Sequence, residues 1–554
     1  MRPSTRRPVR VIAIACLLLT ACTAMAQDRP ADQPGGRRGG RERPATTQPD
    51  TAAPAPTAGS PSATQQAESQ PGSRPDSNRD TKKEEWPKDS VTKHSITIGG
   101  KTLNYTATAG SLLMKEENGK ERAHIFYIAY TLDDVEDTST RPVTFSFNGG
   151  PGSSSVWLHL GAFGPRRVEM GDAGSLLPPP WKLVDNEFTL LDITDLVFID
   201  PVTTGYSRAV PPEQDDGFHG VQEDINSVGD FIRLWTTRFT RWSSPKFLAG
   251  ESYGTTRAAG LSGYLQRTQG MFLNGIVLIS AVLNFATNDY DRSNDLPYAL
   301  YLPSYAATAW YHKQLAPEQQ RMDIAAFTRE VEQYAVGEYM LALAKGDAMT
   351  PDERTAVAQR LARYTGLSAA YLEQCNLRIE LGRFQKELLR DQRRTVGRLD
   401  GRFLGIDYDA AGESTEYDPS MSAIQGPYTA TINDYVRRDL GYENDLNYEI
   451  LTGRVSPWNY RQYTNRYLNV AETLRSSMSQ NQALKVLVAG GYYDFATPYF
   501  ASKYTMDHLG LDDALRPNIT FTYYEAGHMM YVHMPSLTKL KADIAAFYQA
   551  AMKR

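Results

Sequence analysis

Short apolar runs alternate with longer stretches of helical spacing along most of this chain. Apolar and β-branched runs bounded by turn residues predict strands. These runs lie at residues 95–98, 103–107, 124–131, 143–147, 196–200, 247–249, 275–280, 485–489 and 518–524. Helices are predicted over residues 223–239, where apolar positions have helical spacing, and over residues 255–265. Because predicted strands and helices alternate along the chain, the pattern predicts an α/β fold with a mostly parallel central sheet.

The pattern changes after the run at 275–280. From about residue 301 to 394 the sequence has helical spacing and many charges, and up to about residue 458 it is rich in Gly, Asp and Tyr. We expect a largely helical cap over about residues 285–458, inserted into one domain that spans residues 89–554. A cap on such a scaffold shapes a substrate pocket, although a helical insertion could equally form the contact of a homodimer.

The first 88 residues differ from the rest in composition. Basic residues, an apolar stretch over residues 11–19 and a small-residue ending predict a signal peptide over residues 1–26. Ala24-Met25-Ala26 fits ordinary cleavage, whereas Leu19-Thr20-Ala21-Cys22 resembles a bacterial lipobox in which Cys22 would carry a lipid anchor, and both remain open. Residues 27–88, rich in Pro, Gly, Ser, Thr and Gln, predict a disordered tether. We expect an exported protein, periplasmic or secreted, or a lipoprotein, without a transmembrane helix.

Amino-acid composition and net charge exclude some classes of function. Hydrophobic content of 41% and charged content of 22% are typical of globular proteins, and a net charge of −5 gives no sign of a nucleic-acid-binding surface. Cys16 and Cys22 fall within the predicted signal peptide, and Cys375 lies in a helical stretch where we expect it to pack in the core. We therefore expect no disulfide framework, no metal site and no cofactor.

Ser252 lies in Gly250-Glu251-Ser252-Tyr253-Gly254, between a predicted strand and a predicted helix. A strand, a sharp turn and a helix are the context of a nucleophile elbow, in which the serine oxygen projects from a strained turn. The flanking glycines are required where neighbouring backbone comes too close for larger side chains. The pentapeptide is a weak signal by itself, so the rest of the chain has to supply the partners of the serine.

Two later segments supply these partners. The strand at 485–489 leads to Asp494, and the strand at 518–524 leads to His528. The chain order Ser, Asp, His, with acid and base on loops after the last strands, is that of the α/β-hydrolase fold. In this chemistry Ser252 attacks a carbonyl, His528 transfers the proton and Asp494 orients His528. Alternatives in poorer strand context are, as the base, His508 and His533, and, as the acid, Asp507, Asp512 and Asp513.

Together these motifs resemble those of the serine carboxypeptidase family, peptidase family S10, over roughly residues 90–550. The resemblance is carried by the segment from Asn148 to Ser154 (Asn-Gly-Gly-Pro-Gly-Ser-Ser), the Ser252 pentapeptide, the strand leading to Asp494, and Gly527-His528-Met529. Residues 200–207 are similar to a further signature of the family.

The resemblance implies release of C-terminal residues from peptides or proteins through an acyl-enzyme on Ser252. It also implies that the backbone N–H groups of Gly150 and Tyr253 form the oxyanion hole. Asn148, Gly149 and Glu251 would hold the terminal carboxylate of the substrate. Glu251 could do so only in its protonated form, because two carboxylates at hydrogen-bonding distance cannot both stay ionised.

The chain departs from the family pattern at several positions. Ala162 stands where many members carry a glutamate that partners Glu251, and Ser153 stands where a disulfide-bonded cysteine is usual. Thr255-Thr256 follows the pentapeptide where a second glycine is common. Two alternatives therefore stay open, namely an esterase or acyltransferase with the same triad, and a catalytically silent surface binding protein.

Overall fold

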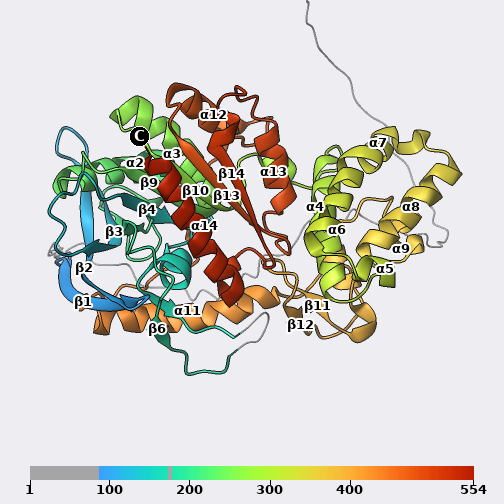
Figure 1. Cartoon of the computed structure of the whole chain (residues 1–554), viewed down its shortest axis with the longest axis horizontal. Helices are drawn as coiled ribbons and strands as arrows, with labels where there is room; N and C mark the ends of the chain where they lie inside the picture. The colour runs from blue at the N-terminus through green and yellow to red at the C-terminus, as the bar shows by residue number, and fades with distance from the viewer. Residues whose placement is uncertain (1–85, 172–176, 554) are drawn as a thin grey trace, which may run out of the picture. The chain divides into compact units, whose positions relative to one another are not determined.

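A ten-stranded sheet forms the centre of the structure (Figure 1). The computed structural model describes residues 86–171 and 177–553, so the predicted signal peptide and the tether up to residue 85 lie outside the described residues. The strands of the sheet are β1 (Ser90–Ile98), β2 (Lys101–Lys115), β3 (Glu121–Leu132), β4 (Val143–Phe147), β7 (Asp195–Ile199), β8 (Arg208–Ala209), β9 (Lys246–Ser252), β10 (Gly275–Ala281), β13 (Lys485–Gly491) and β14 (Ile519–Tyr524).

The strand order confirms the predicted α/β-hydrolase fold with a mostly parallel sheet. The order is β1-β2-β3-β7-β4-β9-β10-β13-β14, and β8 pairs with β3. All pairs from β7 to β14 are parallel, whereas β1, β2 and β3 form an antiparallel edge. The carboxyl ends of β4, β9, β13 and β14 therefore lie at one edge of the sheet, where ligands of open α/β sheets bind.

Helices cover both faces of the sheet because the parallel strands are apolar on both sides. Along β10, Ile276 and Leu278 join one buried core, and Val277 and Ile279 join another. The first core is completed by α2 (Val221–Arg238), α3 (Tyr253–Gln269) and α12 (Ala471–Gln480), and the second by α14 (Met534–Met552). Figure 1 shows α14 crossing the sheet. Short α1 (Val156–Leu158) follows β4, and α13 (Tyr499–Asp507) follows β13.

The region between β10 and β13 is largely helical. Its helices before α12 are α4 (Leu296–Tyr311), α5 (Pro317–Gln320), α6 (Ile324–Tyr334), α7 (Met340–Lys345), α8 (Pro351–Thr365), α9 (Ala369–Gln374), α10 (Leu381–Glu387) and α11 (Pro419–Arg438). Helices α4 to α10 enclose a core of their own, which contains Cys375 and extends to Tyr493 and Phe495 beside Asp494. In contrast, α11 packs into the core of the sheet, where its Tyr428 contacts Trp157.

Smaller features complete the described part of the chain. Two-stranded sheets are formed by β5 (Arg166–Val168) with β6 (Leu183–Asp185), and by β11 (Thr395–Val396) with β12 (Leu404–Gly405). Trp86, in the segment predicted to be a tether, stacks on His124 at a centroid distance of 4.2 Å. Within residues 86–171 and 177–553, every helix is too short or too polar to cross a lipid bilayer.

A buried cluster of charges joins the start of β7 to the loops before β4 and β9. Asp195 accepts hydrogen bonds from Arg141 Nε at 2.7 Å and from Arg241 Nη1 at 2.5 Å. The backbone N–H of Leu132, at the end of β3, donates to the same carboxylate at 3.0 Å. All three charged side chains are buried, so removal of the carboxylate would leave two unpaired cations in the interior.

We expect Asp195→Ala to lower the free energy of unfolding by about 3–5 kcal/mol, because breaking a buried ion pair strands the remaining charges. Urea denaturation followed by circular dichroism measures the change. Asp434→Ala is the control, because Asp434 pairs with Arg438 while both side chains are more than half exposed. That variant should change stability by less than about 1 kcal/mol. Equal losses in the two variants would contradict the importance of the buried cluster.

Candidate functional site

Ser252 lies in a strained turn between β9 and α3. Its backbone angles are φ 60° and ψ −131°, a conformation that residues with side chains rarely adopt. A Cβ atom at Gly250 would lie 2.2 Å from the carbonyl oxygen of Gly254, and one at Gly254 would lie 2.8 Å from that of Phe147. Both glycines are thus required by close backbone approach. The strand, turn and helix lie where the sequence predicts them, with Ser252 at the apex.

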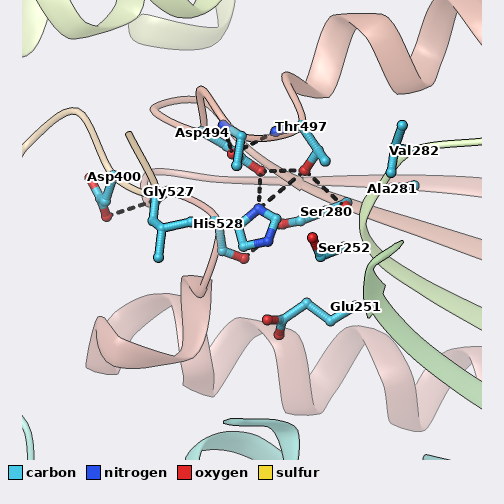
Figure 2. Close-up of polar contacts among 12 residues, drawn as sticks. Glu251, Ser252, Ser280, Ala281, Val282, Asp400, Asp494, Thr497, Gly527 and His528 are labelled. Atoms are coloured by element: carbon cyan, nitrogen blue, oxygen red, sulfur yellow. Dashed lines mark hydrogen bonds and ion pairs between the residues drawn. The ribbon is translucent and has the colours of Figure 1, made fainter. Parts of the chain in front are cut away.

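Asp494 and His528 form a buried hydrogen-bonded pair beside Ser252. His528 Nδ1 and Asp494 Oδ2 are 2.9 Å apart, and Figure 2 shows the Ser252 side chain next to the imidazole of His528. The backbone N–H groups of Ala496 and Thr497 donate to Asp494 Oδ1 at 2.8 and 3.0 Å. The Thr497 hydroxyl lies 2.8 Å from Asp494 Oδ2. These contacts fix the carboxylate, so an Nδ1–H donated to it leaves the His528 Nε2 lone pair free to accept a proton.

Opposing effects set the pKa of His528. Burial disfavours the charged imidazole, but the Asp494 charge, the hydrogen bond that His528 donates to Asp494 and the nearby Glu251 outweigh burial and raise the pKa. The backbone of His528 is also held in place, because the Ser280 hydroxyl donates to its carbonyl oxygen at 2.7 Å. A fixed imidazole with a stabilised charged form suits general acid–base catalysis.

The other histidines and aspartates that the sequence offered are engaged elsewhere. His508 contacts the carbonyl oxygen of Tyr504 at 2.7 Å, and His533 contacts the hydroxyl of Ser536 at 2.8 Å. Asp507 pairs with Lys503, Asp513 pairs with Arg516, and Asp512 accepts from the Ala514 nitrogen at 2.9 Å. The carboxyl–imidazole pair next to Ser252 is thus formed by Asp494 and His528 (Figure 2).

The loop after β4 touches the first turn of α3. A Cβ atom at Gly149 would lie 2.4 Å from the backbone nitrogen of Tyr253, so only glycine fits there. Gly150 has a φ of 102°, in the region that favours glycine. Tyr253 is the first residue of α3, and N–H groups of a first turn have no acceptor within the helix. The loop after β4 and the first turn of α3 are thus in contact directly beside Ser252.

A buried ion pair holds this loop against α3. Arg257 Nη1 donates to the carbonyl oxygen of Asn148 at 2.6 Å, while Arg257 Nε donates to Asp224 Oδ2 at 2.7 Å. Arg257 and Asp224 are 1% and 2% exposed. The roles of Arg257, Asp224, Thr497 and Ser280 do not follow from the motifs of the sequence. Only Thr497 had a local signal, since a hydroxyl three residues after an aspartate is a common turn partner.

Glu251, one residue before Ser252, is buried and has a tyrosine as its partner. The Tyr531 hydroxyl donates to Glu251 Oε2 at 2.6 Å. Burial raises the pKa of Glu251 to about 7, although His528 and the hydrogen bond from Tyr531 favour the ionised form. The sequence predicts no partner for Glu251, because Ala162 stands where the family pattern has an acid. Tyr531 supplies that partner from the segment after His528, where no sequence signal marked it.

Aromatic side chains fill the space next to Ala162. A Cβ atom at Gly161 would lie 2.4 Å from the Tyr531 ring and 2.5 Å from the Tyr428 hydroxyl.

The side-chain nitrogen of Asn148 is a buried donor without a hydrogen-bond partner of good geometry among the described residues. It lies close enough to Glu251 to favour the ionised carboxyl. A buried carboxyl and an amide donor thus face the same site.

Comparison with known proteins gives a family match and more distant relatives. The family model described as serine carboxypeptidase matches residues 100–529. The chain is 25% identical to serine carboxypeptidase-like 45 of Arabidopsis thaliana, over 36% of this chain and 45% of the relative. It is 27% identical to the pheromone-processing carboxypeptidase KEX1 of Yarrowia lipolytica, over 36% of this chain and 30% of the relative. The chain thus spans less than half the length of these curated relatives.

Among solved structures, the fold is similar to that of a prohormone-processing carboxypeptidase, Kex1(Δ)p, from Saccharomyces cerevisiae. The two chains are 16% identical, with a TM-score of 0.48, and the alignment covers 80% of this chain and 91% of the other.

We expect Asp494→Asn to slow the labelling of Ser252 by a fluorophosphonate about 10⁴-fold, because an amide cannot stabilise the charged imidazole. The pKa of His528 should fall, so the rise of labelling with pH should move to lower pH. Thr497→Val keeps the carboxylate and should slow labelling only about tenfold. Labelling of Asp494→Asn at the unmodified rate would contradict the role of Asp494 as the orienting group.

Proposed function

We propose, because the chain belongs to the serine carboxypeptidase family, that it releases C-terminal residues from peptides or proteins through an acyl-enzyme on Ser252. The observation that carries this proposal is the buried Asp494–His528 pair beside the strained turn at Ser252. A hydroxyl is a weak nucleophile, and an adjacent base held by a third group is the usual means of activating it.

In the proposed reaction, the Ser252 oxygen attacks the carbonyl carbon of the last peptide bond while His528 Nε2 takes its proton. The negative charge on the carbonyl oxygen is held by the backbone N–H groups of Gly150 and Tyr253. The imidazolium then protonates the leaving amine, and the acyl group stays on Ser252. Water, activated by the same imidazole, releases the shortened peptide and restores the serine.

Glu251, Asn148 and Gly149 are proposed to recognise the terminal carboxylate of the substrate. A protonated Glu251 has one O–H to donate to that carboxylate, while Tyr531 donates to the other Glu251 oxygen. The buried Asn148 amide supplies a further donor. This recognition would restrict cleavage to the end of a chain, since an internal peptide bond has no carboxylate at that position.

A cavity beside Tyr253 is proposed to hold side chains on the acyl side of the bond. It has a volume of about 400 Å³, and its wall includes Phe285, Tyr460, Tyr463 and Tyr467. The Phe285 ring lies 6.5 Å from the Tyr253 ring. The wall also includes Asn288, Asp289 and Arg466, so we expect the cavity to accept aromatic side chains that carry a polar group, as well as apolar ones, before the cleaved bond.

A second candidate keeps the triad but changes the acceptor or the leaving group. Glu251 is hydrogen-bonded to the neutral Tyr531 hydroxyl, where the family pattern has an acid. This difference at the proposed carboxylate site favours an esterase or acyltransferase. A catalytically silent surface binding protein is the non-enzymatic alternative, and a Ser252 that resists fluorophosphonate labelling would support it.

Export and assembly are proposed from sequence alone. The signal peptide over residues 1–26 and the tether after it would place the enzyme outside the cytoplasm, either cleaved after Ala26 or lipidated at Cys22. The helical insertion would support a homodimer. Mass spectrometry of the mature N-terminus distinguishes the two forms of processing.

Ser252→Ala is expected to abolish release of the last residue from a free-acid peptide, since no other group forms the acyl-enzyme. Ser262→Ala is the matched control, because Ser262 lies on α3, the helix that follows Ser252, and donates to the Ala259 carbonyl oxygen within that helix. Mass spectrometry of the digested peptide, of its C-terminal amide and of a simple ester measures the outcome. A carboxypeptidase prefers the free acid, whereas equal or faster cleavage of the ester or amide would favour the second candidate.

The Michaelis constant for a free-acid peptide should rise as pH rises through about 7, because Glu251 then loses the proton that it donates to the substrate. Glu251→Gln should make this constant independent of pH in that range. Tyr531→Phe removes a hydrogen bond that favours the ionised carboxyl, so the pKa of Glu251 should rise and the change in Michaelis constant should move to higher pH. A constant that stays flat with pH in the unmodified enzyme would contradict the proposed role of Glu251.

A further inference from the structure

A tight loop of the insertion lies against both loops that carry Asp494 and His528. The 397–403 loop joins β11 to β12 and is closed by a hydrogen bond from the Gly397 nitrogen to the Phe403 carbonyl oxygen at 2.9 Å. It belongs to the region between β10 and β13, far in sequence from all three residues of the proposed triad. Its contacts show how an inserted segment can act on the catalytic groups.

The first set of contacts involves the two residues on either side of Asp494. The Phe495 nitrogen donates to the Arg398 carbonyl oxygen at 3.1 Å, and the Gly401 nitrogen donates to the Tyr493 carbonyl oxygen at 2.9 Å. These two bonds engage the residues immediately before and after Asp494. The backbone on both sides of the acid is therefore fixed to the 397–403 loop.

The second set of contacts holds the segment that ends in His528. The His528 nitrogen donates to the Leu399 carbonyl oxygen at 2.6 Å. One residue earlier, the Gly527 nitrogen donates to Asp400 Oδ2 at 2.9 Å, as Figure 2 shows. Arg402 Nη1 donates to the Glu525 carbonyl oxygen at 2.9 Å.

Asp400 and Arg402 form a buried ion pair at the centre of these contacts. Arg402 Nη2 lies 2.6 Å from Asp400 Oδ2, and Arg402 Nε lies 2.9 Å from Asp400 Oδ1. The Arg402 side chain is 2% exposed and the Asp400 side chain is 5% exposed. The guanidinium also lies 5.3 Å from the centre of the Tyr493 ring. Two-point hydrogen bonding fixes the orientation of the carboxylate, which in turn fixes the N–H of Gly527.

Gly527 is glycine because this loop comes so close. A Cβ atom there would lie 2.4 Å from the Leu399 carbonyl oxygen and 2.5 Å from the Asp400 Cβ atom. The glycine before His528 is thus explained by contact with the 397–403 loop, and the two segments have no room to slide past each other.

We propose that Asp400 and Arg402 are positioning residues for His528, and that the insertion thereby completes the acid–base machinery of the sheet. The inference rests on the proposed role of His528. In the reaction the imidazole must reach the Ser252 oxygen and the leaving amine in turn, while it stays bonded to Asp494. A displacement of about 1 Å lowers such rates about 10²-fold, so an anchor one residue before His528 bears directly on catalysis.

The test compares Asp400→Ala with the unmodified full chain. We expect a loss of about 10²-fold in kcat on a free-acid peptide and a parallel loss in the rate at which a fluorophosphonate labels Ser252. The Michaelis constant should stay within about twofold, because the substrate-binding groups do not contact Asp400. Asp400→Asn keeps an oxygen that can accept from Gly527, so it should recover most of the labelling rate. If Asp400→Ala does not fold, Arg402→Gln serves as the test, because it removes the two-point pairing that orients the Asp400 carboxylate and should also slow labelling.

Asp407→Asn is the matched control, because Asp407 forms another buried ion pair of the insertion, with Lys386 at 2.6 Å. It should lower the melting temperature and leave kcat within about twofold. An Asp400→Ala variant that loses stability but is labelled at the unmodified rate would overturn this inference and leave the proposed function intact. Equal loss of kcat in the Asp407→Asn variant would overturn it too, because the effect would then reflect general destabilisation. An unmodified protein that is not labelled at Ser252 overturns both this inference and the proposed function.

Discussion

The loop after β4 and the first turn of α3 pass so close to each other that no side chain fits between them. A Cβ atom at Gly149 would lie 2.4 Å from the Tyr253 nitrogen, and one at Gly254 would lie 2.8 Å from the Phe147 carbonyl oxygen. This approach places the two backbone segments in contact beside Ser252, which lies in a strained turn. The buried Arg257 holds the two segments together through the Asn148 carbonyl oxygen, so the geometry of the site depends on one internal cation.

Much of the fold and half of the site could be predicted because their signals are local. Strands that are buried on both faces are continuous apolar runs, and Ser252, Asp494 and His528 each follow such a run. Tyr531, Arg257 and the 397–403 loop could not be predicted in this way. Each acts through a contact with a distant segment, and nothing in the neighbouring sequence identifies that segment.

In the region between β10 and β13, too, local sequence predicts which positions are buried but not their packing partners. Helical spacing predicts that one face of a segment is buried, but it does not say against what. Helices α4 to α10 bury their apolar faces mainly among themselves, whereas Tyr428 and Tyr435 of α11 pack into the core of the sheet. The hydroxyl of Tyr435 lies 3.0 Å from that of Tyr130 on β3. One continuous stretch of sequence thus contributes to two cores, and between these parts it contacts the loops of Asp494 and His528.

The two carboxyls nearest His528 differ in their surroundings, and this difference separates their proposed roles. Asp494 accepts two backbone N–H groups and lies against the Thr497 hydroxyl as well as His528, so its charge is matched by fixed donors. Glu251 has the Tyr531 hydroxyl, and burial raises its pKa to about 7, with the Asp494 charge acting in the same direction. The fixed donors around Asp494 thus hold this carboxyl against His528, whereas Glu251 retains a proton to donate at pH values below about 7.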